Sequence, residues 1–298
     1  MISVVIPVYK KTGLFLKNLK RNISYLKSCE IVIVNDNPQE TIRKRLSFPS
    51  IILIENKKNL GFGGAVNKGV KKTSGRFVML LNSDVVLGDE SFKTALPHFK
   101  KNKDLFAVSF AQKEKDGSVV GKNIIFWKNG FMQHSIAPNL DQGINAWAEG
   151  GACIFDKEKF KQLGGFDEIY SPFYWEDIDL SYRAWRSGYE VLFDPKIVVE
   201  HFHESTIGSY FTPQTIKAIS YRNQILFVWK NITQLALFCR HLFYLVPNLL
   251  MMLLKGESQF MKGFYLALQK LPQLSKKRIL QKKSFKYSDL NIISKFHE

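Results

Sequence analysis

Cysteine is scarce in this chain of 298 residues, and its few cysteines form no metal-binding pattern. Cys29, Cys153 and Cys239 lie far apart, and none belongs to a Cys-x-x-Cys pair. This usage indicates a reducing compartment and excludes the common thiolate metal centres. The N-terminal residues have no charged segment before their apolar run. We therefore expect a first β-strand there and no signal peptide.

Long uninterrupted apolar runs are also lacking. The most apolar segment, residues 235–254, is interrupted by Arg240, His241, Pro247 and Asn248. It falls short of the roughly 18–20 continuous apolar residues that a membrane-spanning helix needs. Disorder is excluded, because 45% of the residues are hydrophobic and 13% are aromatic, which is ample for the core of a large domain.

Acidic residues are outnumbered, since 43 Lys and Arg stand against 26 Asp and Glu, a formal net charge of +17. The excess is concentrated in residues 216–298, which carry 14 basic and 3 acidic side chains, whereas residues 1–215 carry 29 and 23. A nucleic-acid binder would interleave aromatic and basic residues on one platform. The basic residues lie at the chain end instead, so we expect no nucleic-acid partner.

The basic C-terminal region also has an amphipathic pattern. Phe260, Phe264 and Leu268 recur at helical spacing, and a Lys/Arg-rich stretch follows at residues 276–283. Aromatic-rich amphipathic helices with basic runs bind anionic membrane surfaces. We expect residues 216–298 to form a helical appendage on the inner face of the plasma membrane. The alternatives are packing against the rest of the chain or a homodimer interface.

Short apolar runs alternate with helical patterns through the first 110 residues. Such runs are typical of strands buried in a parallel sheet, and strand–helix alternation predicts an α/β fold with right-handed crossovers. The runs are residues 2–6, 31–34, 51–54 and 77–81.

Polar residues follow several of these strands. Pro7 to Tyr9, Asp36 and Asp84 stand at strand ends, and ligands of such sheets bind beyond the carboxyl ends of the strands. We expect these residues to converge on one crevice. The glycine-rich segment 59–69 opens a helix and permits close backbone approach to a ligand. It lacks the P-loop ending, and simple turn chemistry is the alternative.

An acidic and aromatic stretch follows at residues 173–183, Phe-Tyr-Trp-Glu-Asp-Ile-Asp-Leu-Ser-Tyr-Arg. Its apolar spacing predicts a helix that begins near Glu176 and Asp177 and ends before Gly188. A helix N-terminus favours an ionised carboxylate, and such a group in an aromatic-walled pocket suits a general base. The simpler alternative is that these acids only cap the helix.

Eight short motifs occur in order along the chain. They are Ser3–Tyr9, Val34–Asn37, Asn59–Gly64, Leu80–Asp84, Gly150–Ala152, Gly165–Glu168, Glu176–Leu180 and His201. In this order the chain resembles the inverting glycosyltransferases of family 2, most of all their rhamnosyltransferase-like branch. The resemblance covers about residues 1–225 and includes Arg222-Asn223, a pair that this branch often carries.

This resemblance implies a GT-A fold, in which helices flank a mostly parallel central sheet. The catalytic domain would span residues 1–215, with a donor half at about 1–110 and an acceptor half at about 111–215. The helical region 216–298 would be appended to it. The resemblance also implies a nucleotide-sugar donor and a divalent metal.

The metal motif departs from the family pattern. The Asp-x-Asp motif reads Asn82-Ser83-Asp84 here. By resemblance, Asp84 and His201 bind Mg²⁺ or Mn²⁺, and His203 is the alternative to His201. A hard cation stabilises a departing diphosphate as a Lewis acid. One carboxylate and one imidazole supply little charge, so we expect modest metal affinity.

The remaining roles follow from the same resemblance. Asp36 would accept the N3–H of uracil or thymine, so UDP- and dTDP-sugars both fit. Asp177 would be the catalytic base, with Glu176 and Asp179 as alternatives. Trp175, with Tyr174, would form a platform for a sugar ring, unless it packs in the core. The other donor-binding residues would be Pro7, Tyr9, Asn59, Gly61, Gly64, Asn82, Ser83 and Asp84, and the other acceptor-binding residues Gly150, Gly151 and Glu176.

The sequence therefore predicts an inverting glycosyltransferase, with rhamnose favoured as the transferred sugar. The acceptor would be a hydroxyl of a glycan or lipid-linked glycan. The protein would act in bacterial surface polysaccharide synthesis, in the cytoplasm at the inner face of the plasma membrane. The alternative is a non-catalytic protein of the same fold that binds sugar nucleotides or glycans. The altered metal motif favours this alternative, whereas the presence of Asp84 and Asp177 speaks against it.

Overall fold

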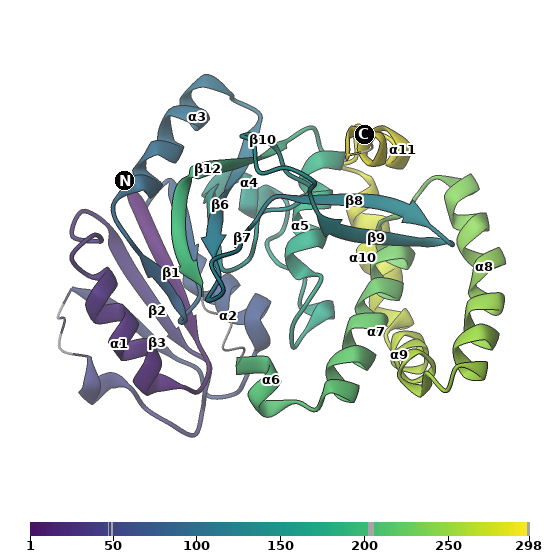
Figure 1. Cartoon of the computed structure of the whole chain (residues 1–298), viewed down its shortest axis with the longest axis horizontal. Coiled ribbons are helices and arrows are strands. Elements are labelled where there is room, and N and C mark those ends of the chain that lie inside the picture. Colours follow the sequence, from purple (N-terminus) through teal and green to yellow (C-terminus); the bar gives the residue numbers. More distant parts are fainter. Residues whose placement is uncertain (47, 49, 202–205, 297–298) are drawn as a thin grey trace.

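A computed structural model describes residues 1–46, 48, 50–201 and 206–296 of the chain (Figure 1). Its strands are β1 (Ile2–Val8), β2 (Glu30–Asn35), β3 (Ile51–Glu55), β4 (Phe77–Leu81), β5 (Val85–Leu87), β6 (Leu105–Lys113), β7 (Val119–Val120), β8 (Asn123–Lys128), β9 (Phe131–Ile136), β10 (Gly143–Ile144), β11 (Ala152–Asp156) and β12 (Glu190–His201). Over the described residues one sheet has the order β10-β12-β6-β11-β4-β1-β2-β3, with β5 beside β12 and β7 beside β6. The hairpin β8-β9 forms a separate small sheet.

The first half of the sheet is wholly parallel. β1 pairs with β2 and β4, and β2 pairs with β3, all in parallel register. Neighbouring residues of β1 face opposite sides of the sheet, so Val4 and Val5, both fully buried, belong to two different hydrophobic clusters. These strands are the four apolar runs of the sequence, and the predicted parallel α/β arrangement is confirmed.

The second half of the sheet is mixed. β11 lies antiparallel between β4 and β6, and its register places Ala152 opposite Leu81. β12 runs parallel to β6, with an irregularity between Asp194 and Val198. Residues 191–193 and 198–199 lie on either side of this irregularity. They form one strand because the chain rejoins β6 after the irregularity.

Helices cover both faces of the sheet. They are α1 (Thr12–Asn22), α2 (Gly61–Val70), α3 (Ala95–Lys101), α4 (Lys157–Gln162), α5 (Glu176–Arg186), α6 (Thr206–Tyr210), α7 (Pro213–Asn231), α8 (Leu235–Leu254), α9 (Ser258–Leu268), α10 (Leu271–Lys282) and α11 (Asp289–Ile293). Phe15 of α1 and Phe99 of α3 pack into one hydrophobic cluster, whereas Val66 of α2 and Leu180 of α5 pack into the other. The sheet is thus a middle layer between two helical layers.

The C-terminal helices form a group beside the sheet, with α8 at the outer edge of the molecule (Figure 1). α7 lies closest to the sheet domain, where its Phe227 ring packs 5.2 Å from the ring of Trp175. The predicted helical appendage is therefore present. A division of the chain at residue 215 stays a prediction, because α7 begins at Pro213 and packs directly on the helix that carries Asp177.

Helix α8 corrects one expectation. It is a continuous helix of 20 residues that contains Pro247, and over 18 of them its mean hydropathy is 1.6. By length and composition this helix could cross a membrane. The polar residues and the proline within it had indicated an apolar run too short for a membrane-spanning helix. The interrupting His241 and Asn248 do not break the helix, because both are buried and bonded to the β8-β9 turn. His241 Nδ1 lies 2.7 Å from Gly130 O, and Asn248 Nδ2 donates to Asn129 O at 3.1 Å.

Candidate active site

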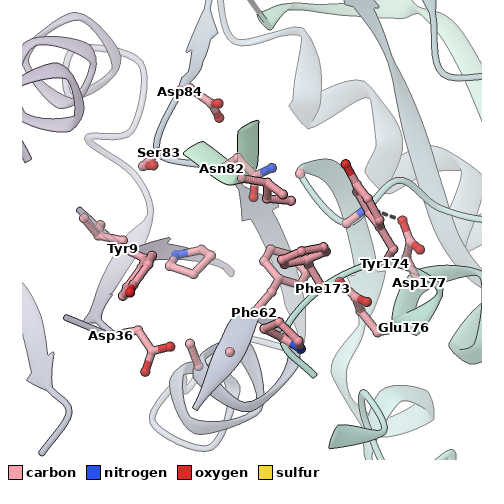
Figure 2. Close-up of a pocket in the computed structure, with 18 of the residues that line it drawn as sticks. Tyr9, Asp36, Phe62, Asn82, Ser83, Asp84, Phe173, Tyr174, Glu176 and Asp177 are labelled. Carbon is pink, nitrogen blue, oxygen red and sulfur yellow. Dashed lines mark hydrogen bonds between the residues drawn. The ribbon is translucent and has the colours of Figure 1, made fainter. Parts of the chain in front are cut away.

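A cavity of about 420 Å³ lies where the carboxyl ends of β1, β2 and β4 meet the N-terminus of α5. Figure 2 shows Asp36 and Tyr9 on one side of it and Glu176 and Asp177 on the other. The predicted site residues that line it are Pro7, Tyr9, Asp36, Asn59, Gly61, Asn82, Ser83, Asp84, Gly150, Gly151, Glu176, Asp177 and His201. The predicted convergence on one crevice is therefore confirmed, whereas the role of each residue stays a prediction.

The donor side is built around Asp36, which is buried after β2. Its carboxylate accepts hydrogen bonds from Asn56 Nδ2 at 2.7 Å and from Leu60 N at 2.9 Å. Burial raises the pKa of Asp36, and these donors oppose the rise. The loop that supplies Leu60 N continues into Gly61, whose φ of +74° favours glycine. A side chain at Gly61 would also collide with Ser171 Oγ, at 2.5 Å from its Cβ.

The altered metal motif is held against the Gly150-Gly151 turn. Asn82 N donates to Gly151 O at 2.9 Å, and a Cβ on Gly151 would lie 2.4 Å from Asn82 Nδ2. Gly151 is therefore required for this close approach. A Cβ on Gly150 would meet the Phe62 ring at 3.0 Å. Both glycines line the cavity, but their small size first serves the packing of the turn.

Asp84 and His201 form the candidate metal site. His201 Nε2 lies 3.3 Å from Asp84 Oδ1, and Gln112 Oε1 lies 2.6 Å from His201 Nδ1. The bond to Gln112 orients the imidazole so that Nε2 faces the carboxylate. Two adjacent ligands of an octahedral ion, each at about 2.1 Å, lie roughly 3 Å apart, so this pair fits a divalent cation.

The metal prediction has a further limit. Within the described residues, no group of three His, Cys, Asp or Glu side chains is arranged to hold a metal. A bound ion would therefore take its other ligands from the donor or from water. His203, the alternative ligand, lies outside the described residues.

Three carboxyl groups meet at the acceptor side. Glu176 is buried, Glu149 and Asp177 are half-buried, and all three line the cavity. Burial, and then the charge of Asp177, raise the pKa of Glu149 and that of Glu176 to about 8 each. Glu149 accepts a hydrogen bond from Asn123 Nδ2 at 2.5 Å, whereas Glu176 Oε2 has no hydrogen-bond partner among the described residues.

Asp177 is the member of this group that ionises most readily. Burial raises its pKa, but Asp177 Oδ1 accepts from Ile178 N at 2.8 Å and Oδ2 accepts from Gly150 N at 3.3 Å, and both bonds oppose the rise. It also lies in the first turn of α5, where the helix dipole favours a negative charge. At neutral pH we expect one negative charge in the group, on Asp177, with protons on both glutamates.

Asp179, an alternative for the base, is occupied elsewhere. Its Oδ1 lies 2.7 Å from Lys230 Nζ, and its Oδ2 accepts from Arg183 Nε at 2.8 Å. Burial raises the pKa of Asp179, but Lys230 and Arg183 bring it below its ordinary value. Asp179 does not line the cavity. It is therefore a structural ion-pair residue and not a base for a substrate in this cavity.

Two predicted site residues do not line the cavity. Trp175 is buried in the core between Phe227 and His134, so its packing leaves no face for a sugar ring. The core-packing alternative is correct for this side chain. Tyr174 beside it is 41% exposed and lines the cavity, so it remains available as a platform. Gly64 faces Leu60 and Glu168 instead of the cavity.

Sequence reasoning missed two polar residues of the cavity, Glu149 and Gln112. Glu149 precedes the Gly150-Gly151 motif, and its position next to that motif was the available signal. Gln112 stands at the end of β6 and is brought to His201 only by the pairing of β6 with β12. No pattern in the sequence indicates that contact.

Two family models match parts of this chain. Residues 3–164 match the family described as Glycosyl transferase family 2, and residues 134–208 match the N-terminal domain of galactosyltransferase. The chain is 28% identical over 185 residues to poly-beta-1,6-N-acetyl-D-glucosamine synthase of Staphylococcus epidermidis, which covers 60% of this chain and 44% of the synthase. It is 24% identical over 202 residues to N-acetylglucosaminyl-diphospho-decaprenol L-rhamnosyltransferase of Mycobacterium tuberculosis. This match covers 57% of this chain and 64% of the rhamnosyltransferase.

Solved structures share the fold. The crystal structure of GalNAc-T7 with UDP, GalNAc and Mn²⁺ has a TM-score of 0.60 at 17% identity, covering 77% of this chain and 48% of that chain. A mannosyltransferase from Pyrobaculum calidifontis in complex with GDP-Man and Mn²⁺ has a TM-score of 0.53 at 13% identity. This match covers 91% of this chain and 75% of the mannosyltransferase chain. These likenesses confirm the expected GT-A fold.

The curated relatives are longer than the matched region, since this chain spans less than two thirds of either one. The family match does not depend on them, because residues 3–164 make up more than half of the chain. The chain therefore belongs to glycosyl transferase family 2.

Proposed function

We propose that this protein is an inverting glycosyltransferase that moves a sugar from a UDP- or dTDP-sugar to a hydroxyl of a glycan or lipid-linked glycan. The observation that carries the proposal is the division of charge in one cavity. Asp36 and the Asp84–His201 pair line one part, and Asp177, the carboxyl that ionises most readily, lies across from them (Figure 2). A site of this kind separates the leaving diphosphate from the base, as an inverting displacement requires.

The chemistry assigned to each residue is direct. Asp177 accepts the proton of the acceptor hydroxyl while the hydroxyl oxygen forms a bond to C1 of the donor sugar. The bond from C1 to the diphosphate oxygen breaks on the opposite face, so the anomeric configuration inverts. Asp84 and His201 would hold a divalent cation, which when bound supplies Lewis-acid stabilisation of the diphosphate. Asp36 would accept the N3–H of the pyrimidine base.

The neutral glutamates support the acceptor side. Glu176 Oε2 is buried at the cavity without a hydrogen-bond partner in the part of the chain that the structure describes, and burial raises the pKa of Glu176 to about 8. A protonated carboxyl can donate one hydrogen bond and accept another. We assign Glu176 the binding of an acceptor hydroxyl next to the one that reacts, and Tyr174 the apolar wall under the sugar ring.

Donor and acceptor are proposed from similarity. The mycobacterial relative is named a rhamnosyltransferase that acts on a lipid-linked N-acetylglucosamine, and this supports rhamnose as the first sugar to test. The staphylococcal relative is named for a polymer of N-acetylglucosamine, which supports that sugar as the second. Both names concern bacterial glycans, so we propose a role in bacterial surface polysaccharide synthesis.

The exposed face of α8 supports a peripheral membrane location on the cytoplasmic side. Phe243 is 73% exposed and Leu254 is 88% exposed, and the stripe they belong to also contains Leu235, Leu242, Val246, Leu250 and Leu253. Soluble surfaces seldom leave so long a stripe uncovered. The chain beyond residue 215 carries the basic excess that anionic lipid attracts. A lipid-linked acceptor would then be presented beside the enzyme.

A transfer assay tests the proposal. Purified protein would be incubated with UDP- and dTDP-sugars, a membrane extract as the acceptor source, and Mg²⁺, Mn²⁺ or EDTA. We expect metal-dependent turnover of one donor, lost in Asp177→Asn and in Asp84→Ala while both variants keep the melting temperature of the wild type. Donor binding without turnover under every condition would instead favour the non-catalytic sugar-nucleotide-binding protein.

A further inference from the structure

The loop that leads into α5 is held in an unfavourable backbone conformation. Tyr174 has a φ of 69° and Trp175 a φ of 75°. The left-handed region is unfavourable for a residue with a side chain, so two such residues in a row persist only where other contacts hold them. The same loop supplies Pro172, Phe173 and Tyr174 to the cavity and ends at Glu176, next to Asp177.

One side chain of α7 contacts most of this loop. Asn223 is fully buried, and its Nδ2 donates to Tyr170 O at 2.9 Å, to Phe173 O at 2.9 Å and to Tyr174 O at 2.8 Å. Tyr170 precedes the cavity-lining residues of the loop, and Phe173 and Tyr174 are two of them. A single amide therefore joins the start of the loop to its left-handed end.

The neighbouring residue completes the contact. Arg222 Nη2 donates to Ser171 O at 2.7 Å and to Tyr170 O at 3.0 Å, and Arg222 Nε donates to Asn223 Oδ1 at 2.8 Å. Burial lowers the pKa of Arg222 to about 10, so it remains a cation at neutral pH. The bond from Arg222 Nε to Asn223 Oδ1 fixes the orientation of the Asn223 amide, so that its Nδ2 faces the loop.

Helix α9 holds the pair in place from behind. A Cβ on Gly263 would lie 2.9 Å from Arg222 N and 2.7 Å from Ala218 O, so only glycine permits this approach of α9 to α7. The pair is thus clamped between α9 and the loop. In front, Pro172 O accepts from Phe62 N at 3.2 Å, so the loop also touches the segment that lines the donor side.

We propose that Asn223, oriented by Arg222, is a positioning residue for the acceptor side of the cavity. It holds the loop in the conformation that places Tyr174 in the cavity wall and starts α5 with Asp177 against Gly150 N. The C-terminal helices then contribute to the reaction without touching the substrate. This inference rests on the proposed glycosyl transfer for its kinetic part and on the loop structure alone for the rest.

The test compares Asn223→Ala and Asn223→Asp with a matched control on the same helix. Gln224 Nε2 donates to Met132 O at 2.9 Å, so Gln224→Ala also removes an amide–carbonyl bond of α7, but one that lies away from the loop. We expect both Asn223 variants to lose about ten- to a hundredfold in kcat, as a displaced base does, and to show a raised KM for the acceptor. The Kd for UDP should stay at the wild-type value. Gln224→Ala should keep the wild-type kcat. The kcat of Arg222→Lys should lie between that of the wild type and that of Asn223→Ala.

Hydrogen exchange supplies a readout that does not depend on catalysis. Peptides covering residues 170–180 should exchange faster in Asn223→Ala than in the wild type and at the wild-type rate in Gln224→Ala. Unchanged exchange in this segment would overturn the inference, as would a wild-type kcat or an equal loss of UDP affinity in the Asn223 variants. If the wild type itself transfers no sugar, the proposed function fails, and the exchange result still decides the role of Asn223.

Discussion

Helices α5 and α8 depart in opposite ways from the usual pattern of an amphipathic helix. In α5 the buried residues include Glu176, Asp179, Arg183 and Arg186, so this helix places its charges inside. In α8 only Leu237, His241, Leu245 and Asn248 are buried, and most of its leucines face outward. The first helix carries the proposed base, and the second lies at the outer edge of the molecule (Figure 1).

The difference lies in what each helix has for partners. The charges of α5 meet buried opposite charges from other elements, since Lys230 of α7 lies 2.7 Å from both Asp179 and Asp167, and Asp289 of α11 pairs with Arg186. In the described chain, few contacts cover the outer face of α8. Buried charge is thus matched inside the fold, whereas exposed apolar surface indicates a partner outside it.

The largest effect is expected at the first turn of α5. Asp177→Asn keeps the size and the helix position of the side chain but cannot accept a proton from the acceptor. General-base catalysis contributes roughly 10²–10⁴-fold, so kcat should fall by at least about 100-fold. Titration with UDP should give the wild-type Kd, because Asp177 lies across the cavity from Asp36. Asp116→Asn, at an exposed acid outside the cavity, is the matched control and should retain full activity.

The ion-pair partners of α5 can be removed next. Lys230→Met leaves Asp167 and Asp179 buried without their shared cation, and breaking one side of such a network costs about 3–5 kcal/mol. Chemical denaturation should show this loss of unfolding free energy. The triple variant Asp167→Asn/Asp179→Asn/Lys230→Met should recover part of it, because the two carboxylates and their shared ammonium are removed together, while Arg183 keeps its hydrogen bonds to the carbonyls of Leu163 and Gly165. If Lys230→Met is as stable as the wild type, the buried charges of α5 do not depend on partners inside the fold, and the contrast with α8 is wrong.

The carboxyl of Glu176 predicts a pH dependence of stability. Its pKa is about 8 in the folded protein, above the ordinary value of 4.5, so the folded state keeps a proton that the unfolded state releases above pH 4.5. This contribution to stability is full below pH 4.5 and is lost as the pH rises towards 8, by about 1 kcal/mol per pH unit at most. Glu176→Gln cannot ionise, so its stability should fall less between pH 5 and pH 8. Denaturation curves at both pH values, with exposed Glu158→Gln as the control, measure the difference. Equal slopes in the wild type and Glu176→Gln would refute a buried neutral Glu176.

The smallest effect is expected on the outer face of α8. Phe243→Glu and Leu250→Glu replace exposed side chains, so the melting temperature should stay unchanged. Burying such a side chain in lipid is worth about 1.5–3 kcal/mol, so each change should weaken binding to phosphatidylglycerol vesicles roughly tenfold. Ile52→Glu, at an exposed residue of β3, is the matched control. If the wild-type protein does not bind vesicles and elutes as a dimer, the outer face of α8 is instead the contact surface for a second copy of the chain.

The short-range features of this molecule could be predicted from the sequence. The parallel strands, the helix that begins at Glu176 and the convergence of Tyr9, Asp36 and Asp84 follow from apolar runs and from the rule that ligands bind at the carboxyl ends of strands. Each depends on contacts between residues near in sequence or on a regular topology. The continuous helix of α8 could not be predicted, because the partners that bury His241 and Asn248 come from the β8-β9 turn, more than a hundred residues earlier.

The sequence by itself determined the family, the parallel half of the sheet and most of the polar residues that meet in the cavity, because these follow from apolar spacing and from short motifs read in order along the chain. Only the tertiary structure decided which carboxyl can act as the base. Asp177 and Asp179 have the same chemistry and stand two residues apart, but successive positions of a helix point in different directions. Asp177 therefore faces the cavity and two backbone N–H groups, whereas Asp179 faces Lys230 and Arg183 in the interior.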